Sequence, residues 1–373
     1  MKGTFWIAAA LIGYSYLGYP VWLWLRSRWS PRPVRRSHQE PAVSAVMVVR
    51  NEAAIVVRKL ENLLSLDYPE AKLDVVVVSD GSSDGTGGML ERFVRGGRVR
   101  TMMKPVSEGK AAGLNDAVQL ASGEVLLFTD VRQQIEPGAL RLLMENFADP
   151  EVGAASGELM LGDPTNGETG KGMGLYWRIE KKIRDLESAS GSVAGATGAI
   201  YCARRSLLEP LPAGTILDDV LIPMQVARQG ARVIFDSRAR AWDSADLGGS
   251  REFARKVRTL SGNYQLLQLA PWLLSSNNPI RFEFISHKLS RLAVPFALLA
   301  LLLASLFLRQ PLYRAALIAQ FVFYALSLVA MAGVRIGPLS RIADPARTFV
   351  VLNCAAMVAF INFVTGRKAV WVR

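Results

Sequence analysis

The chain has 373 residues, half of them hydrophobic, and a mean hydropathy of +0.21. That value is high for a soluble protein and predicts segments that span a membrane. The net charge is +12, but the sequence holds no helix-turn-helix, zinc-finger or RNA-recognition pattern. We therefore expect no nucleic-acid partner, and the positive charge favours an anionic membrane or a phosphate-bearing substrate. Cys202 and Cys354 form no disulfide framework or zinc spacing, which suits a reducing cytosol.

Four apolar segments are candidates for membrane helices. The first, residues 5–25, is uncharged and has the length of about 20 residues that a spanning helix needs. Five arginines follow it within residues 26–36, which indicates an anchor that keeps the downstream chain in the cytosol and not a cleaved signal peptide. The others are residues 292–308, 312–332 and 348–364, and a re-entrant or interfacial position stays open for one of the four. We expect a multi-pass protein of the inner or plasma membrane.

Short β-branched runs alternate with helical stretches from residue 41 to about 240, which predicts an α/β fold with a parallel-rich sheet. The expected strands are 43–49, 73–78, 99–103 and 124–128, and the expected helices are 51–66, 86–94, 109–120, 174–188 and one that begins near 218. Residues 263–274 are expected to form an interfacial helix. Ligands of open α/β sheets bind at the carboxyl ends of the strands, so polar residues there are candidates for chemistry.

Three acidic side chains follow the first two expected strands. Glu52 comes after the first strand, and Asp80 and Asp84 belong to the glycine-bearing run after the second. Carboxylates in such loops can accept hydrogen bonds from a base or ribose. Asp84 is equally well placed to cap a helix, so its alternative role is structural.

A lysine and an aspartate lie at the same expected edge. Lys110 is in the first turn of the helix 109–120, where a cation suits a diphosphate, although a solvated lysine is the alternative. Asp130 follows the fourth strand and could ligate Mg²⁺ or Mn²⁺ bridging diphosphate oxygens, or it could be an ordinary strand-end aspartate.

Asp218 and Asp219 open a later helix. Neighbouring carboxylates oppose each other's ionisation, so one of them can act as a base near neutral pH, although a capping pair is the alternative. The sequence has two histidines, His38 and His287, and both lie beside apolar segments. The expected general base is therefore a carboxylate.

The order of these motifs resembles the family 2 inverting glycosyltransferases over roughly residues 43–260. The motifs are Asn51-Glu52, the run from Asp80 to Thr86, Gly109-Lys110 with Asn115, Thr129-Asp130, and Asp218-Asp219. The flanking apolar segments resemble the polysaccharide synthases of that family, of the hyaluronan, chitin, poly-N-acetylglucosamine and cellulose synthase type. The resemblance implies a GT-A (Rossmann-like) cytosolic domain with flanking transmembrane helices: a membrane helix in 1–28, the transferase domain in 41–260, an interfacial region in 261–288, and about three membrane helices in 289–373.

The same resemblance implies roles for individual residues. The nucleotide would be bound by Glu52, Asp80, Asp84, Lys110 and Asp130, with Asp130 also holding the metal. Asp219 would be the base, with Asp218 beside it, and the acceptor would lie near Gly195, Thr197, Gly198, Arg255 and Arg258.

Two positions depart from the family pattern. The metal motif is usually Asp-x-Asp, but here Arg132 holds the second acidic position, which leaves the use of Mg²⁺ or Mn²⁺ open. The processive synthases carry Gln-x-x-Arg-Trp before the membrane helices, and residues 255–259 keep an arginine without the glutamine or the tryptophan. Long-chain processivity is therefore questionable.

The expected function is transfer of a sugar, with inversion, from a nucleotide-diphosphate donor such as a UDP-sugar onto a polysaccharide or lipid-linked acceptor in exopolysaccharide or cell-envelope glycan synthesis. Membrane lipids are expected partners, and an oligomer or an envelope complex stays open. The alternative is a non-catalytic homologue that binds a nucleotide sugar and scaffolds a secretion complex. A transporter is disfavoured because the apolar segments lack intramembrane charges.

Residues 176–184 carry aromatic and charged side chains that either line the acceptor side or pack as an amphipathic helix.

Overall fold

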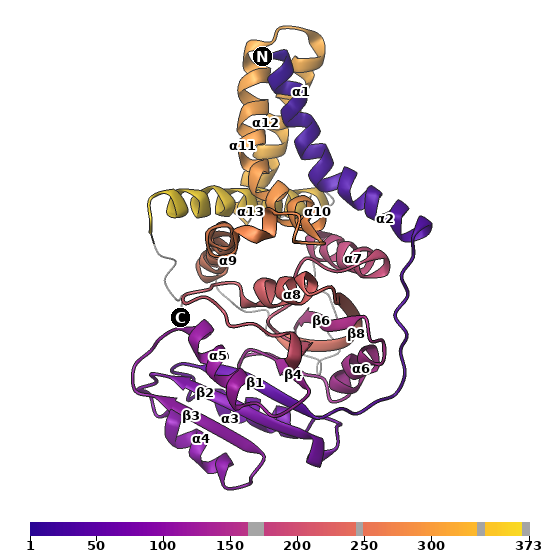
Figure 1. The fold of residues 1–373 in the computed structure, drawn as a ribbon. Coiled ribbons are helices and arrows are strands. Elements are labelled where there is room, and N and C mark those ends of the chain that lie inside the picture. Colours follow the sequence, from indigo (N-terminus) through magenta and orange to yellow (C-terminus); the bar gives the residue numbers. More distant parts are fainter. Residues whose placement is uncertain (163–174, 244–248, 334–339, 368–373) are drawn as a thin grey trace.

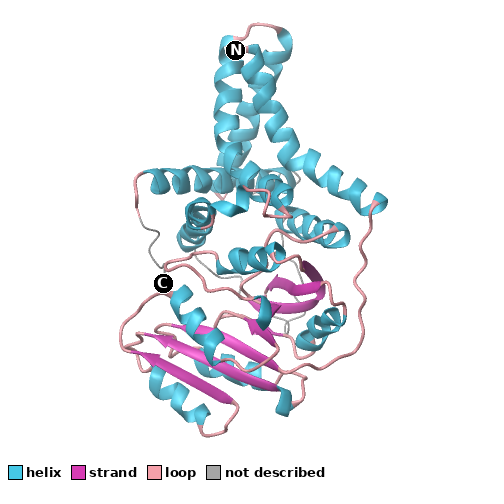
Figure 2. Ribbon diagram, viewed as in Figure 1, coloured by secondary structure: helices cyan, strands magenta, loops and turns pink. Residues whose placement is uncertain are grey.

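The structure is a computed structural model, and it describes residues 1–162, 175–243, 249–333 and 340–367. Figure 1 shows a sheet domain at one end of the molecule and a helical bundle at the other, with α7 (Leu175–Ser190), α9 (Gly249–Leu269) and α10 (Arg281–Glu283) between them. The strands are confined to the sheet domain (Figure 2).

One sheet of eight strands has the order β3-β2-β1-β4-β7-β6-β8-β5. The strands are β1 (Val43–Val49), β2 (Leu73–Asp80), β3 (Val99–Lys104), β4 (Val125–Phe128), β5 (Gln134–Ile135), β6 (Val152–Leu161), β7 (Tyr201–Arg204) and β8 (Arg232–Asp243). The first four are parallel, β7 is antiparallel to both β4 and β6, and β6 is parallel to β8. The expected α/β class is confirmed as a mixed, Rossmann-like sheet.

The strand pairing determines which loops meet. Val49 of β1 is opposite Ser79 of β2, so the loops after both strands leave from one edge. Because β7 is antiparallel to β4, Tyr201 at its start is opposite Phe128 at the end of β4. The loop before β7 therefore reaches the same edge as the loops after β1, β2 and β4.

Alternating side chains of the strands pack into two apolar cores, one on each face of the sheet. On one face Ala45 and Met47 pack with α3 (Val56–Leu64) and α6 (Ala139–Glu145). On the other, Val46 and Val76 pack with α5 (Lys110–Leu120) and α8 (Asp218–Arg228). Burial on both faces is why these strands read as nearly continuous apolar runs. The remaining elements of the sheet domain are α4 (Thr86–Val94) and the short helical turns Glu70–Lys72, Asn146–Ala148 and Arg205–Leu207.

Two expected helices have different bounds. The helix expected over 51–66 begins only at Val56, because Asn51 has a left-handed φ of 55° and residues 51–55 form a turn. The interfacial helix expected over 263–274 is the end of the longer α9, followed by a separate turn at Pro271–Leu274. Proline at position 271 lacks an N–H and ends the helix before it. Because α9 is continuous from Gly249 to Leu269, no element ends at the expected boundary of residues 260 and 261.

The N-terminal segment, which was expected to be one membrane span, bends in the structure. α1 (Lys2–Gly13) leads through a π-helical turn, Tyr14–Gly18, into α2 (Tyr19–Trp29), and Figure 1 shows α2 turning away from the bundle. Phe5 packs with Ala304 and Tyr313 of the bundle, whereas Tyr19 and Leu23 pack with Ile183 of α7. This segment therefore joins the bundle to the sheet domain.

Three helical segments of the described residues are long and apolar enough to cross a membrane, judged by length and composition: Arg281–Phe307, Pro311–Met331 and Ile342–Val364. They contain α11 (Ser290–Phe307), α12 (Pro311–Met331) and most of α13 (Ser340–Val364), and α11 continues a π-helical turn at Phe284–Leu289. The N-terminal segment is not one of the three.

α13 runs across the foot of α11 and α12 in Figure 1. Its Phe349 ring lies 5.5 Å from that of Phe323 on α12, and its Phe360 ring lies 4.9 Å from Phe296 on α11 and 5.7 Å from Tyr264 on α9. α13 therefore packs across both helices and also against α9.

Candidate active site

Asp80 ends β2 and is 2% exposed. Its carboxylate accepts hydrogen bonds from the Ser107 hydroxyl (2.6 Å) and from the backbone N–H groups of Glu108 (2.8 Å) and Gly109 (3.0 Å). Asp80 therefore ties the end of β2 to the loop that precedes Lys110.

The turn after β1 is held by the loop after β2. The side chain of Asn51 accepts a hydrogen bond from the Ser83 N–H (2.8 Å), and Asp84 accepts one from the Ala53 N–H (3.0 Å). Asp84 also accepts a bond from the Thr86 N–H (3.1 Å) at the start of α4, but the N-cap position of this helix is Gly85 and not Asp84. Burial raises the pKa of Glu52, with smaller contributions from the charges of Asp84 and Asp130, against the opposing charge of Arg132.

Lys110 connects two loops of the site. Its ammonium lies 2.9 Å from Asp130 Oδ1 and 3.0 Å from Asp218 Oδ1. Burial alone would lower the pKa of Lys110, but these two carboxylates outweigh burial and raise it. A charged ammonium is therefore fixed between the end of β4 and the start of α8.

Asp219 lies next to this ion-pair group. Its Oδ2 accepts a hydrogen bond from the Gly198 N–H (3.2 Å), and a Cβ on Gly198 would lie 3.2 Å from Asp130 Oδ2 and 3.6 Å from Asp219 Oδ2. Glycine thus permits the two carboxylates to approach the same point of the loop. Burial, with the charge of Asp218, raises the pKa of Asp219 to about 6 against the opposing charge of Lys110. A carboxyl with this pKa is ionised at neutral pH and can take up a proton readily.

The predicted acceptor residues divide into two places. Gly195, with φ of 142°, and Thr197, whose N–H donates to Ser156 Oγ (3.1 Å), belong to the loop beside Asp219. Arg255 on α9 lies 3.9 Å from buried Asp243, which also pairs with Arg132. Arg258 is on the same helix. Arg132 therefore shares Asp243 with Arg255, an arginine that the sequence predicted for the acceptor side.

Lys59 was not expected to belong to this region. It is fully buried on α3 and donates hydrogen bonds to Thr129 Oγ1 (2.8 Å) and to the Gln133 carbonyl (2.7 Å), the residues that flank Asp130. Burial lowers the pKa of Lys59 to about 7. In the sequence it looks like any polar residue of an amphipathic helix, so no signal identified it.

A divalent cation would find few protein ligands here. Within the described residues no group of three or more His, Cys, Asp or Glu side chains could hold a metal. Mg²⁺ is, however, commonly bound by one or two carboxylates together with substrate phosphates. Asp130 has one oxygen on Lys110 and its other oxygen beside Gly198, so the donor set fits a cation that a diphosphate brings with it.

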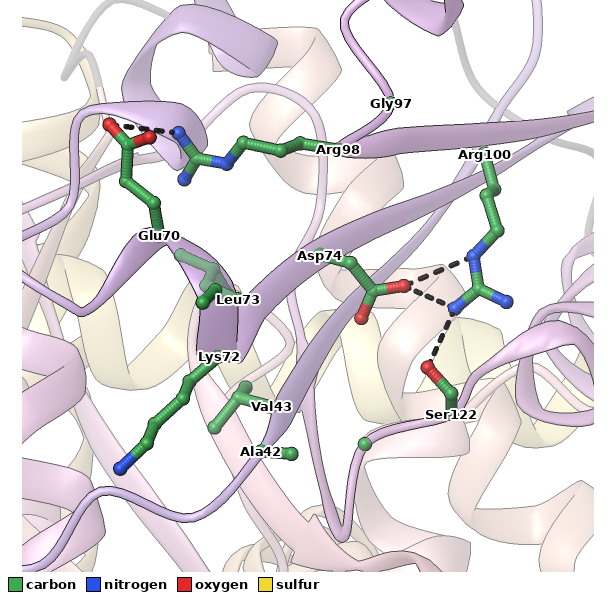
Figure 3. A pocket seen from close by; sticks show the side chains of 12 residues that line it. Ala42, Val43, Glu70, Lys72, Leu73, Asp74, Gly97, Arg98, Arg100 and Ser122 are labelled. Carbon is green, nitrogen blue, oxygen red and sulfur yellow. Dashed lines mark hydrogen bonds and ion pairs between the residues drawn. The ribbon is translucent and has the colours of Figure 1, made fainter.

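Two pockets lie on opposite edges of the sheet. One of about 110 Å³ is lined by Asp219 together with Thr197 and residues of α7. The other, of about 280 Å³, lies at the amino ends of β1, β2 and β3 (Figure 3). Four of its charged residues are paired with one another, Arg100 with Asp74 and Arg98 with Glu70, and Lys72 pairs with Glu40 outside the pocket. The pocket contains none of the predicted site residues.

The structure thus brings together most of the residues that the sequence proposed. Asp130, Lys110, Asp218, Asp219 and Gly198 form one contact group at the carboxyl edge of the sheet. Glu52, Asp80 and Asp84 lie in the adjoining loops, and Arg255 is linked to the site through Asp243 and Arg132.

Comparison with known proteins gives a consistent picture. The family model described as Glycosyl transferase family 2 matches residues 44–211. A poly-beta-1,6-N-acetyl-D-glucosamine synthase of Staphylococcus epidermidis is 25% identical over 247 residues, which is 64% of this chain and 59% of that protein. The same enzyme of Staphylococcus aureus strain COL is 22% identical over 232 residues, covering 60% and 55%. The match thus spans less than two thirds of the length of these relatives.

A solved structure shares the fold over nearly the whole chain. The mannosyltransferase PcManGT from Pyrobaculum calidifontis, in complex with GDP-Man and Mn²⁺, matches with a TM-score of 0.72 and 23% identity. The match covers 98% of this chain and all of that one, so both the sheet domain and the bundle have counterparts in that structure.

Proposed function

Residues 44–211 are a glycosyl transferase family 2 domain, and from this premise we propose that the chain transfers a sugar from a nucleotide-diphosphate donor to a glycan or lipid-linked acceptor at the membrane. The observation that carries the proposal is Asp219, a carboxylate with a pKa of about 6 that shares Gly198 with Asp130. The proposed base and the carboxylate expected at the diphosphate both lie close to Gly198. This closeness suits a direct displacement, in which the acceptor attacks the donor sugar.

The reaction follows from the positions of these groups. Asp219 takes the proton of an acceptor hydroxyl, whose oxygen bonds to the anomeric carbon of the donor while the bond from that carbon to the diphosphate oxygen breaks. The nucleoside diphosphate leaves with the bonding electron pair, and attack from the opposite face inverts the anomeric configuration. Lys110, between Asp130 and Asp218, would face the developing charge of the leaving group.

Mg²⁺ or Mn²⁺ held by Asp130 and the diphosphate would neutralise charge on the leaving group when bound. Glu52, Asp80 and Asp84 would shape and contact the nucleotide side. Asp80 does so through the loop that it holds in place before Lys110. UDP is our first choice of nucleotide because the family resemblance of the sequence implies it, and GDP is to be tested because the PcManGT structure is a complex with GDP-Man.

The membrane arrangement is part of the proposal. We place α11 and α12 across the inner or plasma membrane, with the sheet domain on the cytosolic side, where nucleotide sugars are found. α1 packs against this pair through Phe5 and would cross with them, and α13 would lie at the interface. In this arrangement the product is a glycan of an exopolysaccharide or of the cell envelope.

The experiment that tests the function is nucleotide release by the purified full chain in nanodiscs with membrane lipid extract. UDP-sugars and GDP-sugars are supplied with Mg²⁺, Mn²⁺ or EDTA, and wild type is compared with Asp219→Asn. The expected loss in the variant is about 10²–10⁴-fold, the usual contribution of general base catalysis. Asp67→Asn is the matched control, since this carboxylate is 62% exposed and pairs with Arg141, away from the proposed site.

An equal rate in wild type and Asp219→Asn would remove Asp219 as the base. Nucleotide binding without release from any donor would instead favour the non-catalytic scaffold. The EDTA arm decides whether the cation is required with Arg132 in the second position of the metal motif.

A further inference from the structure

One buried lysine holds both ends of the turn that carries Asp130. Lys59 lies on α3 and is 0% exposed. Its ammonium donates to Thr129 Oγ1 at the start of the turn (2.8 Å) and to the Gln133 carbonyl at its end (2.7 Å). Asp130 lies between these two points in the chain. A single side chain therefore fixes the segment that bears the carboxylate expected at the diphosphate.

The same contact extends to the loop before β7. An ammonium has only N–H donors, so the Thr129 oxygen accepts from the lysine and keeps its own hydrogen. That hydroxyl donates to the Ala199 carbonyl (2.7 Å), and the Asp130 N–H donates to the Gly198 carbonyl (3.1 Å). The Gly198 N–H donates in turn to Asp219 (3.2 Å). A series of hydrogen bonds therefore runs from α3 through the Asp130 turn to the proposed base.

Packing does not require a charge at this position of α3. The other buried residues of the helix, Val56, Leu60 and Leu63, are apolar, and an ammonium removed from water is costly unless hydrogen bonds or charges compensate. Burial lowers the pKa of Lys59 to about 7, and the charge of Asp130 opposes that shift. A methionine has a similar length and would avoid the cost of burying a charge. What a methionine would lack is the two hydrogen bonds to the turn.

We propose that Lys59 is a positioning residue, which holds Asp130 in a fixed place relative to Asp219 through the turn and the loop that it connects. Direct displacement needs the leaving diphosphate and the base to keep their places about the anomeric carbon, and a displacement of about 1 Å can cost about 10²-fold in rate. Because Lys59 is fully buried, it acts through Thr129 and Gln133 and not by contact with a substrate. This inference rests on the proposed function.

The test compares rates of nucleotide release by the full chain in nanodiscs. Each rate is divided by the concentration of sites that bind the released nucleotide, UDP or GDP, in a calorimetric titration. We expect Lys59→Met to release the nucleotide about 10–10²-fold more slowly per site than wild type. A purely structural role would lower the melting temperature or the number of binding sites, but not the rate of each site that remains folded.

Variants of Thr129 test the connection itself. Thr129→Val removes the hydroxyl and Thr129→Ser keeps it, so the serine variant should lose much less activity per site. Lys59→Met and Thr129→Val together should lose no more than the larger of the two single losses, because both break the same series of hydrogen bonds. Asn62→Leu is the matched control, whose rate per site should equal that of wild type. Asn62 is on the same helix and exchanges two hydrogen bonds of 2.8 Å with Ile135 of β5, beyond the Asp130 turn.

The outcomes separate this inference from the proposed function. An unchanged rate per site in Lys59→Met, or an equal loss in Asn62→Leu, would overturn the positioning role while leaving the transferase in place. Losses of Lys59→Met and Thr129→Val that add in the double variant would overturn it as well. A wild type that binds the nucleotide but releases none from any donor would contradict the transferase itself, and this inference with it.

Discussion

The proposed donor side and the proposed acceptor side of the site are built differently. On the donor side, Asp80 accepts three hydrogen bonds and Asp84 bridges two loops, so their oxygens are occupied by the protein. On the acceptor side, Asp219 accepts one bond from Gly198 and is placed next to a second carboxylate. The first arrangement stabilises loops, and the second maintains a reactive group at a cost in stability. Similar residues therefore serve opposite purposes within one sheet edge.

The largest expected effect is the difference in stability between two Asp→Asn variants, one on each side of the site. Asp80→Asn places an amide against the Gly109 N–H, so a buried donor loses its acceptor, and we expect about 2 kcal/mol of destabilisation. Asp219→Asn removes the repulsion with Asp218, so the melting temperature should be unchanged or higher. Thermal unfolding of both variants measures this contrast. Equal losses of stability would show that the two sides are not built differently.

The next expected effect is on pH dependence. Because Asp219 must be ionised to accept a proton and its pKa is about 6, transfer should fall by about tenfold per unit as the pH drops below that value. Initial rates of nucleotide release from pH 4.5 to 8 give the profile. A rate that stays constant down to pH 5 contradicts an Asp219 base.

Lys110→Met gives a second test of the pH dependence of transfer. The ammonium opposes the rise in the pKa of Asp219, so its removal should move the acidic limb of the profile to higher pH and weaken donor binding. Lys104→Met is the matched control, since Lys104 pairs with Glu108 and Asp116 instead. An equal shift of the profile in both variants would show that the loss of any positive charge in this region causes it, and not the loss of Lys110 in particular.

The smallest expected effect concerns Lys59. Its pKa is lowered to about 7 in the folded state, whereas an unfolded lysine titrates near 10.4. The unfolded chain therefore binds more protons between these values, and wild type should gain stability relative to Lys59→Met as pH rises from about 7 to about 10. Melting temperatures of the two proteins across that range measure the difference. A constant difference would mean that the pKa of Lys59 is not lowered.

The sequence predicted the parallel half of the sheet well, because buried strands are local apolar runs. Val43–Val49 and the helix Thr86–Val94 have the expected bounds. The start of α3 was wrong because the left-handed turn at Asn51 depends on contacts with Ser82 and Ser83, which come from another loop. Local patterns carry no information on such pairings.

The same limit applies to the site. Asp219 and Lys110 were predicted because their positions at strand and helix ends are local features. Lys59 and the pairing of Arg132 with Asp243 were missed, since both depend on contacts between residues 70 or more apart in the chain. The bend of the N-terminal segment was missed for a similar reason. A hydropathy profile shows that a segment is apolar, but it gives no information on where the helix changes direction.

The contact between α7 and the foot of the bundle limits how the protein can be divided. His287 lies between Glu180 and Glu187, both buried, and Tyr19 of α2 donates a hydrogen bond to Glu187 (2.7 Å). A fragment that ends near residue 260 would lack His287 and Arg291, the charged partners of these carboxylates. Breaking one such buried pair costs about 3–5 kcal/mol, a large share of the stability of a typical domain. The sheet domain and the foot of the bundle therefore stabilise each other, and we expect a fragment that ends near residue 260 to be less stable than the full chain.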